Sequence, residues 1–205
     1  ATITIESVNG AEKTVVDGGG TNRCFSTYGL KLTNSVVRGF TFRNGSLPNG
    51  AGGATYGGTM IDCIYTNNTC GFYGGGAYGG KLISCKLYCN SGQFGGGACD
   101  AELQDCVLAY NVATNGAGAC GGTLRDCLIF NNTAESYGGG TDEAVAYNCV
   151  YRGNTGSTGG GASYSELNGC IVSNNFATTH GGGLYYGSSE NCTISFNAAA
   201  YYGGG

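Results

Sequence analysis

Two aspartates, Asp105 and Asp126, are the side chains whose type and spacing could most readily do chemistry. Each stands directly before a cysteine, in "DCVLAYN" and "DCLIFNN", and they are 21 residues apart. Two neighbouring carboxylates can bind Ca²⁺, or can serve as acid and base in glycoside cleavage. No Lys or Arg recurs beside them, which favours a solvated polar stripe instead. That column continues through the chain as Asp62, Ser84, Asn148, Gly169 and Asn191.

An aromatic column is the second candidate. His180 is the only histidine, and it precedes a run of three glycines where other stretches carry Tyr or Phe. No Ser, His and Asp set for nucleophilic catalysis can be assembled around it. Tyrosine rings stack on sugars and anchor protein contacts at low entropic cost. The column is either a stack that stabilises a turn or a contact surface for glycans or proteins, and its members are Tyr73, Phe94, Tyr137, His180 and Tyr202.

A repeat of 21 or 22 residues positions both candidates. Seven cysteines set the period, namely Cys63, Cys85, Cys106, Cys127, Cys149, Cys170 and Cys192. Asparagine follows each cysteine five positions later, at Asn68, Asn90, Asn111, Asn132, Asn154, Asn175 and Asn197. A large apolar residue stands two positions after each cysteine, and a glycine cluster such as "GGGA" precedes most of them. Nearer the N-terminus Gly39 replaces the cysteine, and Asn44 is expected to continue the asparagine column.

This period, with a composition rich in strand formers, predicts one coil of a β-solenoid, because helical repeats are longer. Side chains alternate along a strand, so the cysteine and the apolar residue two positions later should both face the interior. The asparagine should end that strand at a turn and donate its amide to the next coil, forming a ladder. We predict an all-β chain, a single-stranded right-handed parallel β-helix of about nine coils and about 40 Å in length.

The chain contains 12 cysteines, and the repeat divides them. The seven of the repeat should be free and buried, where cysteine behaves as a small hydrophobe. One thiol per coil in a straight row does not surround an ion, so no metal site is expected there. Cys99 and Cys120 hold equivalent positions on adjacent coils, and their spacing permits a disulfide, although in-register parallel strands would strain it.

The asparagine column, the inward cysteine and aliphatic columns, and two N-terminal stretches together resemble the right-handed parallel β-helix superfamily, the pectin-lyase-like fold. The stretches are "TVVDGGGTNRCF" (14–25) and "SVVRGFTFRNG" (35–45). Later units with "GGGA" and "FNN" are similar to the repeats of bacterial secreted proteins, autotransporter passengers and polymorphic outer-membrane proteins. The resemblance implies the fold over almost the whole chain. It leaves function open, because this fold hosts enzymes, adhesins and fibre proteins alike.

Composition excludes several classes of function. The chain has 205 residues, 42 of them Gly, a net charge of −4 and only 11% charged residues. Nothing in it would attract a phosphate backbone, so nucleic acid is not an expected partner. No apolar run is long enough for a membrane span, and no cofactor is expected.

We therefore expect a single β-helix domain over residues 1–205, with degenerate coils in 1–50 and regular repeats in 51–205. No C-terminal cap is visible, so either the chain continues or its ends stack head to tail into a filament. The expected function is structural and adhesive rather than enzymatic: a rigid stalk or fibre-forming protein, extracellular or on the cell surface, that meets itself, other surface proteins or glycans. The alternatives are a polysaccharide lyase or hydrolase centred on Asp105 and Asp126, and a glycan binder resembling a phage tailspike.

Overall fold

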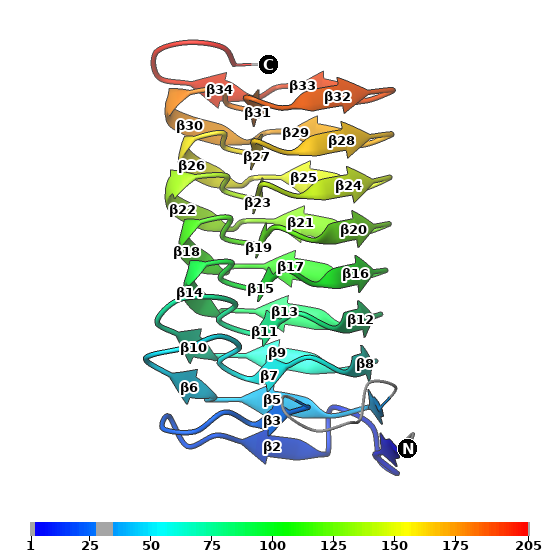
Figure 1. Cartoon of the computed structure of the whole chain (residues 1–205). Helices are drawn as coiled ribbons and strands as arrows, with labels where there is room; N and C mark the ends of the chain where they lie inside the picture. The colour runs from blue at the N-terminus through cyan, green and yellow to red at the C-terminus, as the bar shows by residue number, and fades with distance from the viewer. Residues whose placement is uncertain (1–2, 28–34, 205) are drawn as a thin grey trace.

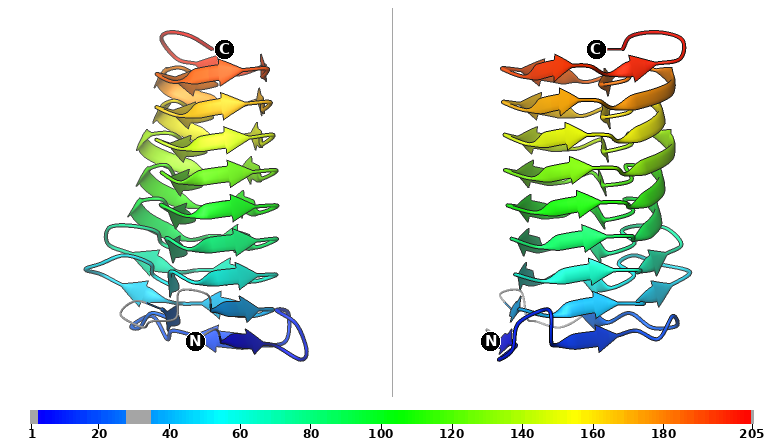
Figure 2. Two further views of the ribbon diagram at one scale, coloured as in Figure 1. Left: turned by 45° about the vertical axis from the view of Figure 1, so that its right-hand side comes forward. Right: turned by 180° about the vertical axis from the view of Figure 1, so that it is seen from behind.

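The chain winds in stacked turns along one axis. The computed structural model describes residues 3–27 and 35–204, and within these ranges it contains strands and turns but no helix. The N- and C-terminal ends lie at opposite ends of a rod (Figure 1). Figure 2 shows the same stack of turns from two further sides. Every strand pairing among the described residues is parallel and joins one turn to the next, so this is a parallel β-solenoid, as the repeat predicts.

Each complete turn contributes one strand to each of four sheets, which we number in the order in which the chain visits them. Sheet 1 contains β1 (Thr4–Glu6), β4 (Val36–Arg38), β8 (Thr59–Ile61), β12 (Lys81–Ile83), β16 (Glu102–Gln104), β20 (Thr123–Arg125), β24 (Val145–Tyr147), β28 (Glu166–Asn168) and β32 (Ser188–Glu190). Sheet 2 contains β2 (Val15–Asp17), β5 (Thr41–Arg43), β9 (Ile64–Thr66), β13 (Lys86–Tyr88), β17 (Val107–Ala109), β21 (Leu128–Phe130), β25 (Val150–Arg152), β29 (Ile171–Ser173) and β33 (Thr193–Ser195).

The other two sheets are made of shorter or glycine-bounded strands. Sheet 3 contains β6 (Ser46–Leu47), β10 (Thr69–Cys70), β14 (Ser91–Phe94), β18 (Val112–Asn115), β22 (Thr133–Tyr137), β26 (Thr155–Thr158), β30 (Phe176–His180) and β34 (Ala198–Ala199). Sheet 4 contains β3 (Phe25–Ser26), β7 (Thr55–Tyr56), β11 (Ala77–Tyr78), β15 (Ala98–Cys99), β19 (Ala119–Cys120), β23 (Thr141–Asp142), β27 (Ala162–Ser163) and β31 (Leu184–Tyr185). In the described ranges the strands amount to about eight turns, slightly fewer than the nine coils predicted.

The interior is a set of columns, one residue from each turn. The middle residue is buried in every sheet 1 strand from β4 to β28 and in every sheet 2 strand from β5 to β29, as Leu103 and Leu108 are. The repeat cysteines lie beside them at the corner between these sheets, and all but the half-buried Cys192 are buried. They are free thiols, as predicted. Cys127 Sγ lies 3.1 Å from the carbonyl oxygen of Arg125, and Cys127 belongs, like the other buried repeat cysteines, to the hydrophobic core.

Two turns have tyrosine in place of an aliphatic core residue of sheet 2, and the same two turns have threonine in sheet 4. Tyr65 and Tyr151 are fully buried, and each phenol is hydrogen-bonded to a threonine of sheet 4. The partners are Thr55 and Thr141, at 3.3 and 3.2 Å. Four of the intervening and neighbouring turns, whose sheet 2 core residue is aliphatic, have alanine at the threonine position. A buried phenol needs a partner, so the two substitutions come as a pair.

The corner between sheets 1 and 2 explains the polar column that contains the two aspartates. Asp105 and Asp126 adopt left-handed backbone conformations, with φ of 53° and 54°. Asp, Asn and Gly tolerate this conformation better than other residues. The same corner is filled in the other turns by residues that share a positive φ, namely Gly39, Asp62, Ser84, Asn148, Gly169 and Asn191. The column is thus selected by backbone geometry. The prediction that Gly39 replaces the cysteine was therefore wrong, because the register places Phe40 at the position of Cys63.

The predicted asparagine ladder is present in the corner between sheets 2 and 3. Asn132 lies at its centre: its Nδ2 donates to Asn154 Oδ1 at 3.0 Å and to the carbonyl of Leu108 at 2.9 Å. Its Oδ1 accepts from the backbone N–H and from the Nδ2 of Asn111, both at 3.0 Å. All four hydrogen-bonding positions of the amide are therefore used. The pattern of Nδ2-to-Oδ1 bonds runs from Asn68 to Asn197.

Asn44 is not part of this ladder, and its assignment from the sequence was wrong. The register pairs Arg43 with Thr66, so Gly45 occupies the place equivalent to Asn68 and accordingly donates its N–H to Asn68 Oδ1. Asn44 instead occupies the left-handed position before the ladder, with φ of 50°, and its amide donates to the carboxylate of Asp17 at 3.1 Å. The ladder ends at Asn68 because Gly45 has no side chain to continue it.

Cys99 and Cys120 pair in register on β15 and β19, as their equivalence in the repeat requires. Both are buried and both are free, so the disulfide that their spacing permits is not formed. In-register parallel strands hold the two side chains side by side at the strand spacing, which is wider than the usual Cβ separation of a disulfide.

Candidate functional site

Asp105 and Asp126 lie on adjacent turns and face solvent, but they have no convergent partner. Calcium takes six to eight oxygen ligands, so two corner carboxylates make an incomplete site. Within the described residues no group of three or more His, Cys, Asp or Glu side chains is arranged to hold a metal ion.

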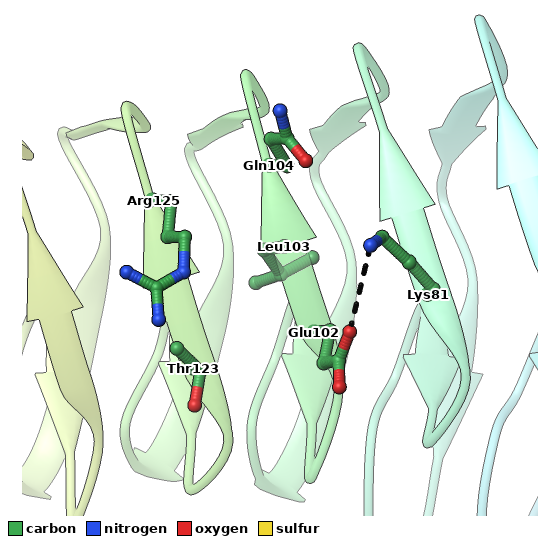
Figure 3. Close-up of a pocket in the computed structure, with 6 residues that line it drawn as sticks. All are labelled: Lys81, Glu102, Leu103, Gln104, Thr123 and Arg125. Atoms are coloured by element: carbon green, nitrogen blue, oxygen red, sulfur yellow. Dashed lines mark ion pairs between the residues drawn. The ribbon is translucent and has the colours of Figure 1, made fainter.

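A shallow hollow of about 220 Å³ lies on the outer face of sheet 1, near these aspartates but not lined by them. Figure 3 shows its side chains projecting from three neighbouring strands, and they are Lys81, Glu102, Leu103, Gln104, Thr123 and Arg125. Lys81 Nζ lies 3.8 Å from Glu102 Oε2, an exposed pair that contributes little stability. The Arg125 guanidinium lies 4.1 Å from the centre of the Tyr147 ring. Lys81 and Arg125 therefore contact Glu102 and Tyr147 rather than Asp105 or Asp126.

The predicted aromatic column lies at the ends of the sheet 3 strands. Tyr73 and Phe94 stack with ring centres 5.4 Å apart, and His180 and Tyr202 stack at 5.5 Å. The strand register places two non-aromatic residues, Asn115 and Thr158, in the same column between them. The column therefore contains two stacked pairs, with Tyr137 alone between Asn115 and Thr158.

A second aromatic set belongs to sheet 4 and the residue after it, across the glycine turn from the first. Tyr78 lies 6.0 Å from Tyr73, and Tyr164 meets Tyr137 edge-on at 5.8 Å. The glycines between the two sets allow adjacent turns to pack closely: a Cβ on Gly139 would overlap the carbonyl oxygens of Thr155 and Gly160. We call the combined surface the aromatic corner, and it comprises Tyr56, Tyr73, Tyr78, Phe94, Tyr137, Tyr164, His180, Tyr185, Tyr186 and Tyr202.

The corner ends in an open hollow of about 310 Å³ near the last turn. Its lining brings together two residues of the predicted contact surface with the tyrosines that follow the glycines: His180, Gly181, Leu184, Tyr185, Tyr186, Tyr202 and Gly203. The side chains of Tyr186 and Tyr202 are 69% and 73% exposed, which leaves their rings available to a ligand.

Sequence reasoning missed Asp142, a carboxylate in the middle of the aromatic corner. It occupies the outward sheet 4 position held by Cys120 and Ser163 in the neighbouring turns, and it is only 3% exposed. Asn115 Nδ2 donates to Asp142 Oδ2 at 3.3 Å, whereas Asp142 Oδ1 and Ser163 Oγ have no hydrogen-bond partner. Burial, followed by the charge of Glu143, raises the pKa of Asp142 to about 6. The sequence signal that could have identified Asp142 is that it is the one acidic residue at a repeat position otherwise held by Cys, Ser or Tyr in the described turns.

No protein-family model, no curated protein and no solved structure matches this chain. Among the described residues no helix is long and apolar enough to cross a membrane. What the chain does must therefore be inferred from its own side chains.

Proposed function

We propose that this protein is a structural and adhesive solenoid, a rigid rod that presents the aromatic corner as its contact surface. The observation that carries the proposal is the aromatic corner itself, in which exposed rings recur along the rod from Tyr73 to Tyr202. Tyr73 and Tyr137 are 44% and 39% exposed, and each contacts other rings of the aromatic corner, so together they form an exposed aromatic surface. Large, rigid aromatic side chains are the usual anchors of protein and glycan contacts.

Rigidity is supported by the hydrogen bonds that join the turns. Each internal ladder asparagine ties three consecutive turns together, and the backbone of all four sheets does the same. A rod held in this way keeps its aromatic rings in a fixed row, so several weak contacts can form at once without a further loss of entropy.

The setting we propose is extracellular or on a cell surface, and the family we propose is the right-handed β-helix of the pectin-lyase-like fold, as in autotransporter passengers. The asparagine ladder and the 21- or 22-residue turn support this assignment. The partners we propose are other copies of the chain, surface proteins or glycans.

The competing proposal is a polysaccharide lyase or hydrolase centred on Asp105 and Asp126. The left-handed corner provides a structural reason for both aspartates, which weakens the reason to give them a catalytic role. Incubation with a polyuronide panel, with and without Ca²⁺, distinguishes the two. Cleavage that Asp105→Ala abolishes would replace the adhesive proposal by the enzymatic one.

The adhesive proposal is tested by coating beads with the protein and measuring their retention on polysaccharide-coated and protein-coated surfaces, with sedimentation velocity to follow self-association. We expect the double variant Tyr73→Ala and Tyr137→Ala to lose retention or self-association. The control Phe196→Asn, which removes an 86% exposed ring on a different corner, should behave as wild type. Retention that is equal in all three proteins would contradict the proposal.

A further inference from the structure

The hollow at the C-terminal part of the aromatic corner has two aromatic walls set at an angle. One wall is the stacked pair of His180 and Tyr202, whose ring planes are 21° apart. The other is formed by Tyr185 and Tyr186, which meet edge-on with centres 4.7 Å apart. Tyr186 also stacks on Tyr164 at 5.7 Å with planes only 9° apart, so its orientation is fixed from behind. The rings of both walls are therefore already oriented in the protein without a ligand.

The floor of the hollow is low because glycine occupies it. Gly181 and Gly203 both have left-handed backbones, with φ of 64° and 68°. A Cβ on Gly181 would come within 2.6 Å of the Leu184 carbonyl oxygen, so a side chain there would be strained as well as obstructive. A flat molecule can thus rest between the walls and against the backbone.

The chemistry of the lining selects the class of ligand. Its side chains are three tyrosines, one histidine and one leucine, with no carboxylate, Lys or Arg. An anionic sugar would find no positive partner except a protonated His180, and a cationic group would find no carboxylate. Phenol hydroxyls and an imidazole at the rim of apolar ring faces match a ligand with an apolar face and hydroxyl edges.

We propose that this hollow binds the ring of a neutral hexopyranoside, with the C–H face of the sugar against Tyr202 or Tyr186 and its hydroxyls hydrogen-bonded to the phenols and to His180. The inference rests on the proposed function, because it assigns a ligand to one part of the aromatic corner. It adds the position of the site and the neutral, hydroxyl-bearing class of its ligand.

The experiment titrates the whole protein with maltohexaose, cellohexaose and polygalacturonate by calorimetry. Tyrosine fluorescence follows binding independently, because the chain has 15 Tyr and no Trp. The variants are Tyr202→Ala and Tyr186→Asn, the latter chosen because asparagine tolerates the left-handed backbone of residue 186. Phe196→Asn is the matched control, since it removes an exposed ring from a left-handed position in the same turn of the rod.

We expect at least one neutral hexasaccharide to bind, with affinity lowered about tenfold by either hollow variant and unchanged by the control, as the loss of one stacking ring predicts. Circular dichroism should show all three variants folded, because the replaced rings are exposed.

Two outcomes would overturn the inference: neither neutral sugar binds wild type, or polygalacturonate binds more tightly in a Tyr202-dependent manner. If bead retention still depends on Tyr73 and Tyr137 in that case, only the sugar site fails and the adhesive function stands. If the neutral sugar binds but retention never depends on the aromatic corner, the adhesive function fails and the site stands.

Discussion

Asp142 is a single side chain whose burial makes the stability of the rod depend on pH. Its carboxylate is 3% exposed with one oxygen unpaired, and burial raises its pKa from 3.8 to about 6. The folded chain therefore holds this proton at a pH where the unfolded chain has released it. Folding is accordingly weakened as the pH rises from about 4 through 6, and the cost is constant above about pH 7.

The corresponding prediction concerns Asp142→Asn. The amide has the same shape but no charge, so the variant should match wild type near pH 4 and be more stable by about 2 kcal/mol above pH 7, a value that allows for partial solvent screening. Urea unfolding at several pH values measures this difference. Ser163→Ala, which leaves the carboxylate in place, should still lose stability as the pH rises, and a pH-independent gain for Asp142→Asn would contradict the role of the buried charge.

At the same scale, the asparagine ladder and the buried thiols could be predicted from the sequence because each repeats in every turn with one spacing. Asn44 was misplaced because two adjacent residues compete for one ladder position in that turn, and the glycine that occupies it carries no pattern of its own. Asp142 was missed because it appears once, and its burial depends on the close approach of Asn115 from a different sheet.

At the scale of the strand and its corner, backbone geometry decides which residues are tolerated. The sequence predicted the strands of sheet 2, since a buried cysteine and a buried aliphatic residue lie two positions apart. It did not predict four strands per turn, because sheet 4 strands such as Ala119–Cys120 have two residues, too few to display an alternating pattern. The corner aspartates could be read as catalytic candidates because Asp occurs both in catalytic sites and in left-handed turns.

Asp126 gives a test of this distinction between geometry and chemistry. Asp126→Val should destabilise the fold by about 1–2 kcal/mol, because a β-branched residue is strained at a φ of 54°. Asp126→Gly should be close to neutral, since Gly169 holds the same corner in another turn at a φ of 65°. Thermal or urea unfolding compares them, with Thr123→Val on the adjoining strand as a control in which valine suits the backbone. Equal stability of the Val and Gly variants would contradict a geometric role for Asp126.

At the scale of the whole molecule, the rod is a one-dimensional stack in which each turn touches only its neighbours. Stability in such a stack is a sum of intrinsic terms and of interfaces between adjacent turns. The outer strands are the least covered: β1 and β32 are exposed along their length, whereas the middle residues of β17 and β21 are fully buried. Hydrogen exchange should therefore be slowest in the central turns and faster toward both ends.

Asn132→Ala should reveal this organisation. The substitution removes the acceptor for the N–H and amide of Asn111 and the donors to Leu108 and Asn154, all within the central turns. Leaving these buried groups unpaired should cost about 3 kcal/mol in urea unfolding. Hydrogen-exchange mass spectrometry should show faster exchange in peptides covering β17 to β25, with little change at β4 or β32. Asn131→Gly, which alters the exposed residue before the ladder and suits its left-handed backbone, is the control. Faster exchange spread evenly over every turn would instead mean that the rod opens as one cooperative unit, and that its rigidity does not arise turn by turn.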